Sequence, residues 1–156
     1  MFNDNNKTSK ARDEVSIHHL IKELAIYEKA PNEVSNTITE LKKHLFEEEI
    51  CHAIVAIEKK AIIGFSLYYI SYSTWKGKCL YLEDFYVQPL HRKKGIGELL
   101  FNETIKIAES IKAKRMDWQV LRWNEIAINF YKKQGTKLDS GWIQGRISFD
   151  SDKGNN

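Results

Sequence analysis

The sequence predicts one α/β (α+β) domain, in which a central mixed, mostly antiparallel sheet is flanked by helices on both faces. Two observations predict this class: apolar residues change from helical spacing to long strand-like runs near residue 51, and helical stretches return later in the chain. A chain of 156 residues, 42% of them hydrophobic, is large enough for one core. We expect a single domain over 13–150, with frayed polar ends at 1–12 and 151–156.

Two amphipathic helices open the predicted domain. The stretch IHHLIKELAIYEK at 17–29 places its apolar residues on one helical face, and Pro31 follows it. Thr37-Ile-Thr-Glu40 has the pattern of a capping box, in which the first and last side chains each bond to the other's backbone amide. The sequence therefore predicts a first helix that ends before Pro31 and a second that begins after Thr37.

Apolar runs rich in β-branched and aromatic residues follow. CHAIVAIE at 51–58 and AIIGFSLYYIS at 61–71 flank Lys59-Lys60, which predicts an antiparallel hairpin. CLYLEDFYV at 79–87 predicts a third strand, closed by Pro89. The remaining predicted elements are a helix over 95–113, a strand over 116–123, a helix over 124–135 and a strand over 141–149.

Charge and cysteine usage argue against several classes of function. Lys and Arg number 24 against 21 Asp and Glu, a balance that does not indicate binding to nucleic acid or to a membrane surface. The uncharged run at 61–75 is shorter than the roughly 20 residues of a membrane helix. Cys51 and Cys79 lie in apolar runs, and the five histidines have no metal-ligand spacing, so we expect no metal. The start MFNDNNKTSK has no apolar signal core, so we expect a cytoplasmic protein.

The motif Arg92-Lys-Lys-Gly95-Ile-Gly97 lies between the third strand and the helix after it. Glycines let the backbone close around an anion, and unpaired amides at a helix N-terminus favour negative charge. The motif is not a P-loop, because no Gly-Lys-Ser/Thr follows, and Leu100 occupies the third glycine position of a dinucleotide fingerprint. It predicts a phosphate cradle, although Gly-x-Gly alone fits a simple loop-to-helix turn equally well.

Two motifs together resemble the GNAT superfamily of N-acetyltransferases. Arg-x-x-Gly-x-Gly after a strand is similar to the pyrophosphate loop of that family, and WNEIAINFYKKQG at 123–135 is similar to its second signature. The resemblance implies the GNAT fold, acetyl-CoA as cosubstrate and a homodimer. The residues that it implies for acetyl-CoA binding are Phe85, Tyr86, Val87, Arg92, Lys93, Lys94, Gly95, Ile96, Gly97, Glu98, Asn124 and Tyr131.

Shorter segments narrow the resemblance to the spermidine/spermine and thialysine N-acetyltransferases. These are IKELAIYEK at 21–29, YSTWKGK at 72–78 and YLEDFYV at 81–87. Polyamine-acetylating relatives tend to carry an acid two residues before the tryptophan, where this chain has Ser73, so the segment looks more like the thialysine side. Relatives also open with an apolar first strand, whereas this N-terminus is polar. The residues implied for substrate binding are Tyr27, Glu28, Trp75, Glu83 and Asp84.

The resemblance also implies catalytic roles for Tyr131 and Glu83. Tyr131 would protonate the departing thiolate, and Glu83 would attract the substrate ammonium and accept its proton through a water. Without the motif, Tyr131 fits a helix tyrosine half-buried against the sheet. Adjacent strand residues point to opposite faces unless a bulge intervenes, so Glu83 and Asp84 are expected to have separate tasks.

The sequence therefore predicts an acetyl-CoA-dependent N-acetyltransferase that acts by direct attack of a small primary amine such as a polyamine, thialysine or lysine. Three alternatives stay open: acetylation of protein lysines or N-termini, a non-catalytic CoA-binding module, and a nucleic-acid binder based on the basic segments HRKK and KAKR. The acids Glu28 and Glu83 with Trp75 favour a compact cationic substrate, and Tyr131 favours catalysis.

Overall fold

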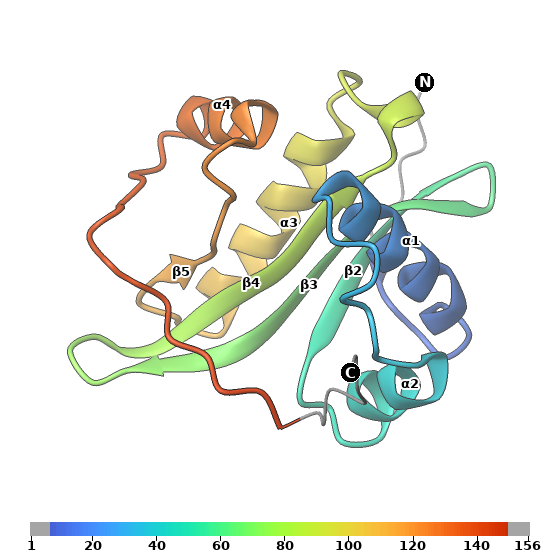
Figure 1. Cartoon of the computed structure of the whole chain (residues 1–156), viewed down its shortest axis with the longest axis horizontal. Helices are drawn as coiled ribbons and strands as arrows, with labels where there is room; N and C mark the ends of the chain where they lie inside the picture. Colours follow the sequence, from blue (N-terminus) through green and yellow to red (C-terminus); the bar gives the residue numbers. More distant parts are fainter. Residues whose placement is uncertain (1–6, 150–156) are drawn as a thin grey trace, which may run out of the picture. The chain divides into compact units, whose positions relative to one another are not determined.

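The computed structural model describes residues 7–149 (Figure 1). Residues 1–6 of the expected frayed N-terminus lie outside the described residues, and so do residues 150–156, which include the whole expected tail. The chain divides into two compact units, Met1–Gln119 and Val120–Asn156. The first unit contains β1 (Lys7–Thr8), α1 (Glu14–Tyr27), α2 (Ile38–Phe46), β2 (His52–Glu58), β3 (Ala61–Ser73), β4 (Gly77–Val87), the short 3₁₀ helix η1 (Pro89–His91), α3 (Ile96–Ser110) and β5 (Met116–Asp117), and the second contains α4 (Glu125–Lys133).

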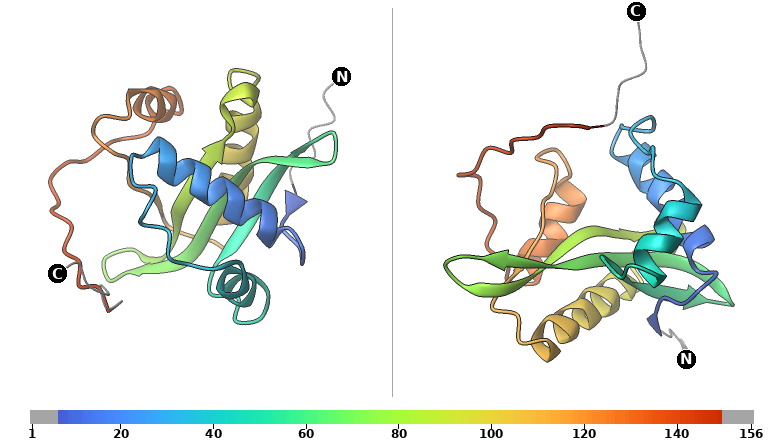
Figure 2. Two further views of the ribbon diagram at one scale, coloured as in Figure 1. Left: turned by 45° about the vertical axis from the view of Figure 1, so that its right-hand side comes forward. Right: turned by 90° about the horizontal axis from the view of Figure 1, so that it is seen from below.

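The first unit is a sheet of five strands in the order β1-β2-β3-β4-β5. Strands β1 to β4 pair antiparallel with their neighbours, and β5 runs parallel to β4. Helices α1 and α2 cover one face of the sheet and α3 covers the other (Figure 2). The predicted fold class, a mixed and mostly antiparallel sheet with helices on both faces, is confirmed.

Each face of the sheet has its own buried layer. On the α1 side, Ile17 and Leu20 pack with Phe65 of β3, and all three side chains are buried. On the α3 side, Ser66 and Thr104 are buried and their hydroxyl groups lie 2.7 Å apart, which satisfies two polar groups that burial would otherwise leave unpaired. These two layers fix β3 and β4 between the helices.

Local sequence signals place the first half of the fold as predicted. Thr37 caps α2 by accepting from the Glu40 amide at 3.2 Å, and the Glu40 carboxylate accepts from the Thr37 amide at 2.9 Å. Lys59 and Lys60 join β2 to β3 with φ values of 48° and 71°. Two successive positive φ values are typical of the tight hairpin turn whose twist matches that of the flanking strands.

Three predicted features differ from the structure. The strand expected over 116–123 is only Met116–Asp117, because pairing with β4 stops after Tyr81. The segment 141–149 forms no strand among the described residues: a strand needs a neighbour for its backbone groups, and none pairs with it there. Lys7 and Thr8, within the stretch expected to be frayed, pair with β2 as β1 despite their polar side chains.

Candidate active site

A β-bulge in β4 brings two acidic residues to the same face of the sheet. Leu67 of β3 lies opposite Asp84, whereas the next residue, Tyr68, lies opposite Leu82, so Glu83 is the extra residue. Leu67 belongs to the buried cluster on the α1 side, and cross-strand partners share a face. The two acids were expected to have separate tasks unless a bulge intervenes, and the bulge is present: it directs Asp84 to the α1 side, where Glu83 also lies.

Glu28 is the C-cap residue of α1, and its carboxyl group forms a cluster of three with those of Glu83 and Asp84. Burial first, and then the negative charges of Glu83 and Glu28, together raise the pKa of Asp84 to about 7. Burial also raises the pKa of Glu28. Desolvation and mutual repulsion both disfavour three negative charges here, so the cluster is a site that a cation would stabilise.

Two tyrosines that the sequence analysis did not assign lie beside these acids. Tyr69 of β3 and Tyr81 of β4 are cross-strand partners with stacked rings whose centroids are 5.2 Å apart. Burial and then the charge of Glu83 raise the pKa of both phenols. The pair therefore adds two aromatic faces next to an acid, a combination that attracts organic cations. Only the strand register, which sequence periodicity does not give, could have placed Tyr69 against Tyr81.

The loop after β4 has the backbone geometry of an anion cradle. Lys93 and Gly95 have φ values of 60° and 83°, in the left-handed region, where successive amides can turn towards one anion. Gly95 is the N-cap of α3 and has no side chain to bond to the first amides of the helix, unlike Thr37 in α2. The side chains of Lys93 and Lys94 are exposed beside these amides. This geometry fits a phosphate-bearing ligand.

Strand β4 also offers a backbone edge beside this loop. Its pairing with β5 is limited to Leu80 and Tyr81, so within residues 7–149 no second strand pairs with its last part, Leu82 to Val87. An extended ligand that carries amide groups can add to such an edge as a strand would. Phe85 fixes this part of β4 from the α3 side, because its ring packs edge-on against Phe101 with centroids 5.8 Å apart.

Tyr131 lies on α4, in the second compact unit, and is 5% exposed. The N-cap of this helix is Asn124, whose side-chain oxygen accepts from the Ala127 amide at 3.2 Å. In the second motif, Ala127 follows Asn124 by three residues, which is the spacing that lets an N-cap side chain accept from a backbone amide of the first helical turn. Gly135, with φ 72°, follows the C-cap residue of this helix.

Trp75 lies away from the carboxyl cluster within this chain. It is 82% exposed in the turn between β3 and β4, where Ser73 accepts hydrogen bonds from the Trp75 and Lys76 amides. Glu83 follows Gly77 by six residues along β4, a span of about 20 Å at about 3.3 Å per residue. The structure therefore does not bring Trp75 together with the other residues expected to bind substrate.

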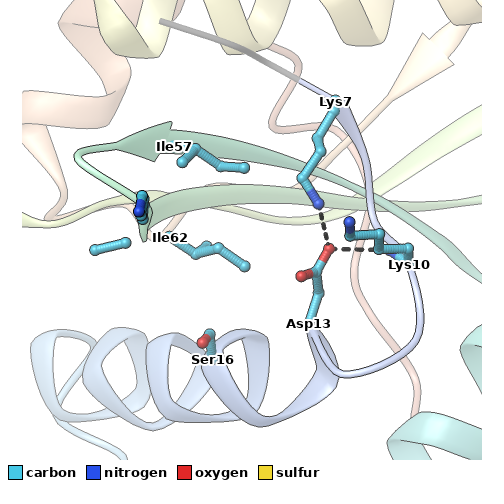
Figure 3. Close-up of a pocket in the computed structure, with 8 residues that line it drawn as sticks. Lys7, Lys10, Asp13, Ser16, Ile57 and Ile62 are labelled. Atoms are coloured by element: carbon cyan, nitrogen blue, oxygen red, sulfur yellow. Dashed lines mark hydrogen bonds and ion pairs between the residues drawn. The ribbon is translucent and has the colours of Figure 1, made fainter.

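A pocket of about 490 Å³ lies beside the N-terminal end of α1 and contains none of the residues predicted for the site (Figure 3). Lys7 and Asp13 form an ion pair of 2.6 Å in this pocket, and the Lys10 amide donates to the same carboxylate at 3.0 Å. These contacts attach the strand β1 to the start of α1. The polar side chains of this pocket therefore have a structural role, and the acids of β4 take no part in it.

The sequence and the fold both match known acetyltransferases. The model of the acetyltransferase (GNAT) family matches residues 17–136. A thialysine N-epsilon-acetyltransferase of Bos taurus is 36% identical over 140 residues, which cover 84% of this chain and 82% of that protein. The chain belongs to the GNAT family of acetyltransferases. Enzymes of this family use acetyl-CoA as cosubstrate, and the phosphate cradle and the edge of β4 in this GNAT chain fit that ligand.

Other GNAT relatives support the same fold and branch. A human spermidine/spermine N(1)-acetyltransferase-like protein 1 is 32% identical over 145 residues, which are 86% of this chain and 21% of that protein. The crystal structure of an aminoglycoside acetyltransferase from an uncultured soil metagenomic sample superposes with a TM-score of 0.78 at 16% identity, over 93% of this chain and 95% of that one. At this identity the structural match supports the GNAT fold alone. Among residues 7–149, no group of three or more His, Cys, Asp or Glu side chains could hold a metal ion, and no helix is long and apolar enough to cross a membrane.

Proposed function

We propose that this protein transfers the acetyl group of acetyl-CoA to the primary amine of a small cationic molecule, such as thialysine, lysine or a polyamine. The observation that carries this proposal is the group of carboxyls formed by Glu28, Glu83 and Asp84 on one face of the sheet. The names of the thialysine and spermidine/spermine relatives support the same class of substrate.

Glu83 and Asp84 bind and deprotonate the amine in this proposal. An amine arrives as an ammonium ion, and its nitrogen is nucleophilic only after it loses a proton. Asp84, with a pKa of about 7, can exchange a proton near neutral pH, and Glu83 beside it supplies charge that attracts the cation. Tyr69 and Tyr81 line the same face and present aromatic surface to the methylene groups of the substrate.

Backbone amides of the loop from Lys93 to Gly97 would hold the pyrophosphate of acetyl-CoA, and Lys93 and Lys94 would balance its charge. The edge of β4 from Phe85 to Val87 would bind the pantetheine arm. When bound, acetyl-CoA supplies the thioester carbonyl that the amine attacks. Tyr131 is the proposed proton donor to the sulfur that leaves, because a thiolate needs a proton and the phenol can donate one.

The experiment that tests this proposal measures release of CoA thiol from acetyl-CoA with thialysine, lysine, spermidine, spermine and a histone-tail peptide as acceptors. Tyr131→Phe serves as the catalytic variant, and Tyr72→Phe, an exposed tyrosine at the end of β3, serves as its matched control. We expect turnover of at least one small amine, a loss of about tenfold or more for Tyr131→Phe, and unchanged turnover for Tyr72→Phe.

Other outcomes would change the assignment in defined ways. If only the peptide is acetylated, the acceptor is a protein lysine or N-terminus. If CoA binds by calorimetry but no acceptor releases thiol, the chain is a CoA-binding module and the catalytic proposal is wrong for these acceptors. Equal turnover of wild type and Tyr131→Phe would remove Tyr131 from the mechanism.

We also propose a homodimer, with the segment 141–149 as its contact. Its side chains Trp142, Ile143 and Phe149 are 80%, 98% and 94% exposed, a run of apolar surface that association would cover. Light scattering of the whole chain and of Trp142→Ser with Ile143→Ser tests this, because the double variant should be monomeric if the segment forms the contact. A cytoplasmic location, expected from the sequence, stays a prediction.

A further inference from the structure

The side chain of Arg92, the first residue of the phosphate-loop motif, packs between two aromatic rings. Its guanidinium carbon lies 5.1 Å from the ring centroid of Tyr27 and 5.3 Å from that of Tyr86, both within the range of a cation–π contact. Its Nε donates a hydrogen bond of 2.7 Å to the carbonyl oxygen of Val87, the last residue of β4. These three contacts involve the planar group that sequence analysis had assigned to the phosphates.

The two rings belong to elements that the proposed function assigns to different ligands. Tyr27 is the last residue of α1 and precedes Glu28 of the carboxyl cluster. Tyr86 belongs to β4, two residues after Asp84, and its hydroxyl donates to Glu23 of α1 at 3.2 Å. Arg92 therefore contacts the acidic end of α1 and the strand that leads into the anion loop.

A second set of hydrogen bonds reinforces this junction. Gln88 donates from its side-chain nitrogen to Glu23 at 2.9 Å, and its backbone amide donates to the Ile63 carbonyl at 2.9 Å. The start of the loop is thus bound to α1 through Glu23 and to β3 through Ile63. These hydrogen bonds surround the position of Arg92, whose cation lies between the rings of Tyr27 and Tyr86.

We propose that Arg92 is a positioning residue that couples the two ligand sites: its guanidinium, held between Tyr27 and Tyr86, sets the end of α1 and the anion loop relative to each other. The inference rests on the proposed function for the identity of the two ligands. Phosphate binding then belongs to the loop amides with Lys93 and Lys94. A substitution at Tyr27 should therefore weaken the binding of CoA, although Tyr27 lies on the helix that carries Glu28.

A double-mutant cycle tests the coupling through binding of CoA. The Kd of CoA is measured by calorimetry for wild type, Arg92→Gln, Tyr27→Leu and the double variant. We expect each single variant to weaken CoA about three- to tenfold, and the double variant to be no weaker than Arg92→Gln, because each change breaks the same contact. Lys94→Gln is the matched control, and its effect should multiply with that of Tyr27→Leu.

Arg92→Lys separates positioning from simple charge. Lysine keeps the positive charge but lacks the planar group that stacks between rings, so it should weaken CoA as much as Arg92→Gln does. The KM of the amine should rise in both variants. Circular dichroism and thermal melting of each variant establish that it folds.

Two results would overturn the inference. If Arg92→Lys binds CoA as tightly as wild type, or if Tyr27→Leu leaves CoA binding unchanged, Arg92 acts as a phosphate ligand and not as a link between the sites. Because CoA binding needs no acceptor, these outcomes remain distinct from a failure to find an amine that turns over.

Discussion

Replacing Asp84 with asparagine should stabilise the protein, and the gain should grow with pH. Burial first, and then the charges of Glu83 and Glu28, raise the pKa of this carboxyl from 3.8 to about 7, whereas in the unfolded chain it ionises near its usual value. The unfolded state therefore loses the proton first as pH rises, so wild type loses stability between about pH 4 and about pH 7 and then stays level. Asparagine keeps the shape of the side chain but cannot ionise.

The size of the effect follows from the pKa shift. A shift of about three pH units corresponds to a penalty of about 4 kcal/mol in the free energy of unfolding when Asp84 is fully ionised. About 2.5 kcal/mol of this penalty should develop between about pH 5 and about pH 8, where urea unfolding is readily measured. The measured quantity is the difference in free energy of unfolding between Asp84→Asn and wild type at both pH values.

Glu83→Gln is a useful second variant, because the charge of Glu83 is the second cause of the shift after burial. Removing that charge should move the pH-dependent loss of stability to lower pH without abolishing it. A carbon-13 NMR titration of the Asp84 carboxyl should show the same movement directly. If the stability difference between Asp84→Asn and wild type is the same at pH 5 and pH 8, Asp84 titrates normally and the argument from burial is wrong.

Three further predictions concern separate parts of the fold. Gly95→Ala places a side chain at φ 83° where no atom lies within 4 Å of the added carbon, so strain alone should cost about 1 kcal/mol of stability and weaken CoA binding, as seen by calorimetry. Thr37→Ala removes the capping box of α2 and should lower the free energy of urea unfolding by about 1 kcal/mol, with no change in CoA affinity. Tyr69→Leu breaks the stacked pair with Tyr81 and should raise the KM of the amine several-fold while leaving that of acetyl-CoA unchanged, and equal effects on both constants would contradict the placement of the pair.

The sequence is sufficient to predict features that depend on local chemistry. The capping box at Thr37, the turn at Lys59-Lys60 and the N-cap at Asn124 form where their side chains and backbone preferences require them. The loop before α3 can likewise be predicted from its sequence, because only particular residues tolerate its left-handed backbone positions. The predicted strands over 116–123 and 141–149 were wrong in extent or existence, because a strand depends on a neighbour that local sequence does not specify.

The bulge was missed, although the sequence carries a signal for it. Leu80 and Leu82 lie opposite Ile70 and Tyr68, on the face of α3, and Phe85 lies on the same face opposite Ser66. Leu82 follows Leu80 by two residues, but Phe85 follows Leu82 by three. The alternation of side chains between the two faces of β4 is therefore interrupted between Leu82 and Phe85. A period-two interpretation of LYLEDFYV hides this change because tyrosine and phenylalanine fit either face. The position of Arg92 could not be predicted, since its partners come from α1 and β4.

In the proposed function one strand serves both ligands, and the bulge makes this possible. A regular strand would alternate Glu83 and Asp84 between the two faces, and only one acid could reach the α1 side. The inserted residue directs both acids to that side and also returns Phe85 to the face of α3, where Phe101 fixes it. The cost is a carboxyl at Asp84 that burial and its neighbours hold in the neutral form up to about pH 7. A bound ammonium ion reverses that balance by stabilising the carboxylate, so binding of the amine should release a proton from Asp84 and leave a base beside the nitrogen that must be deprotonated.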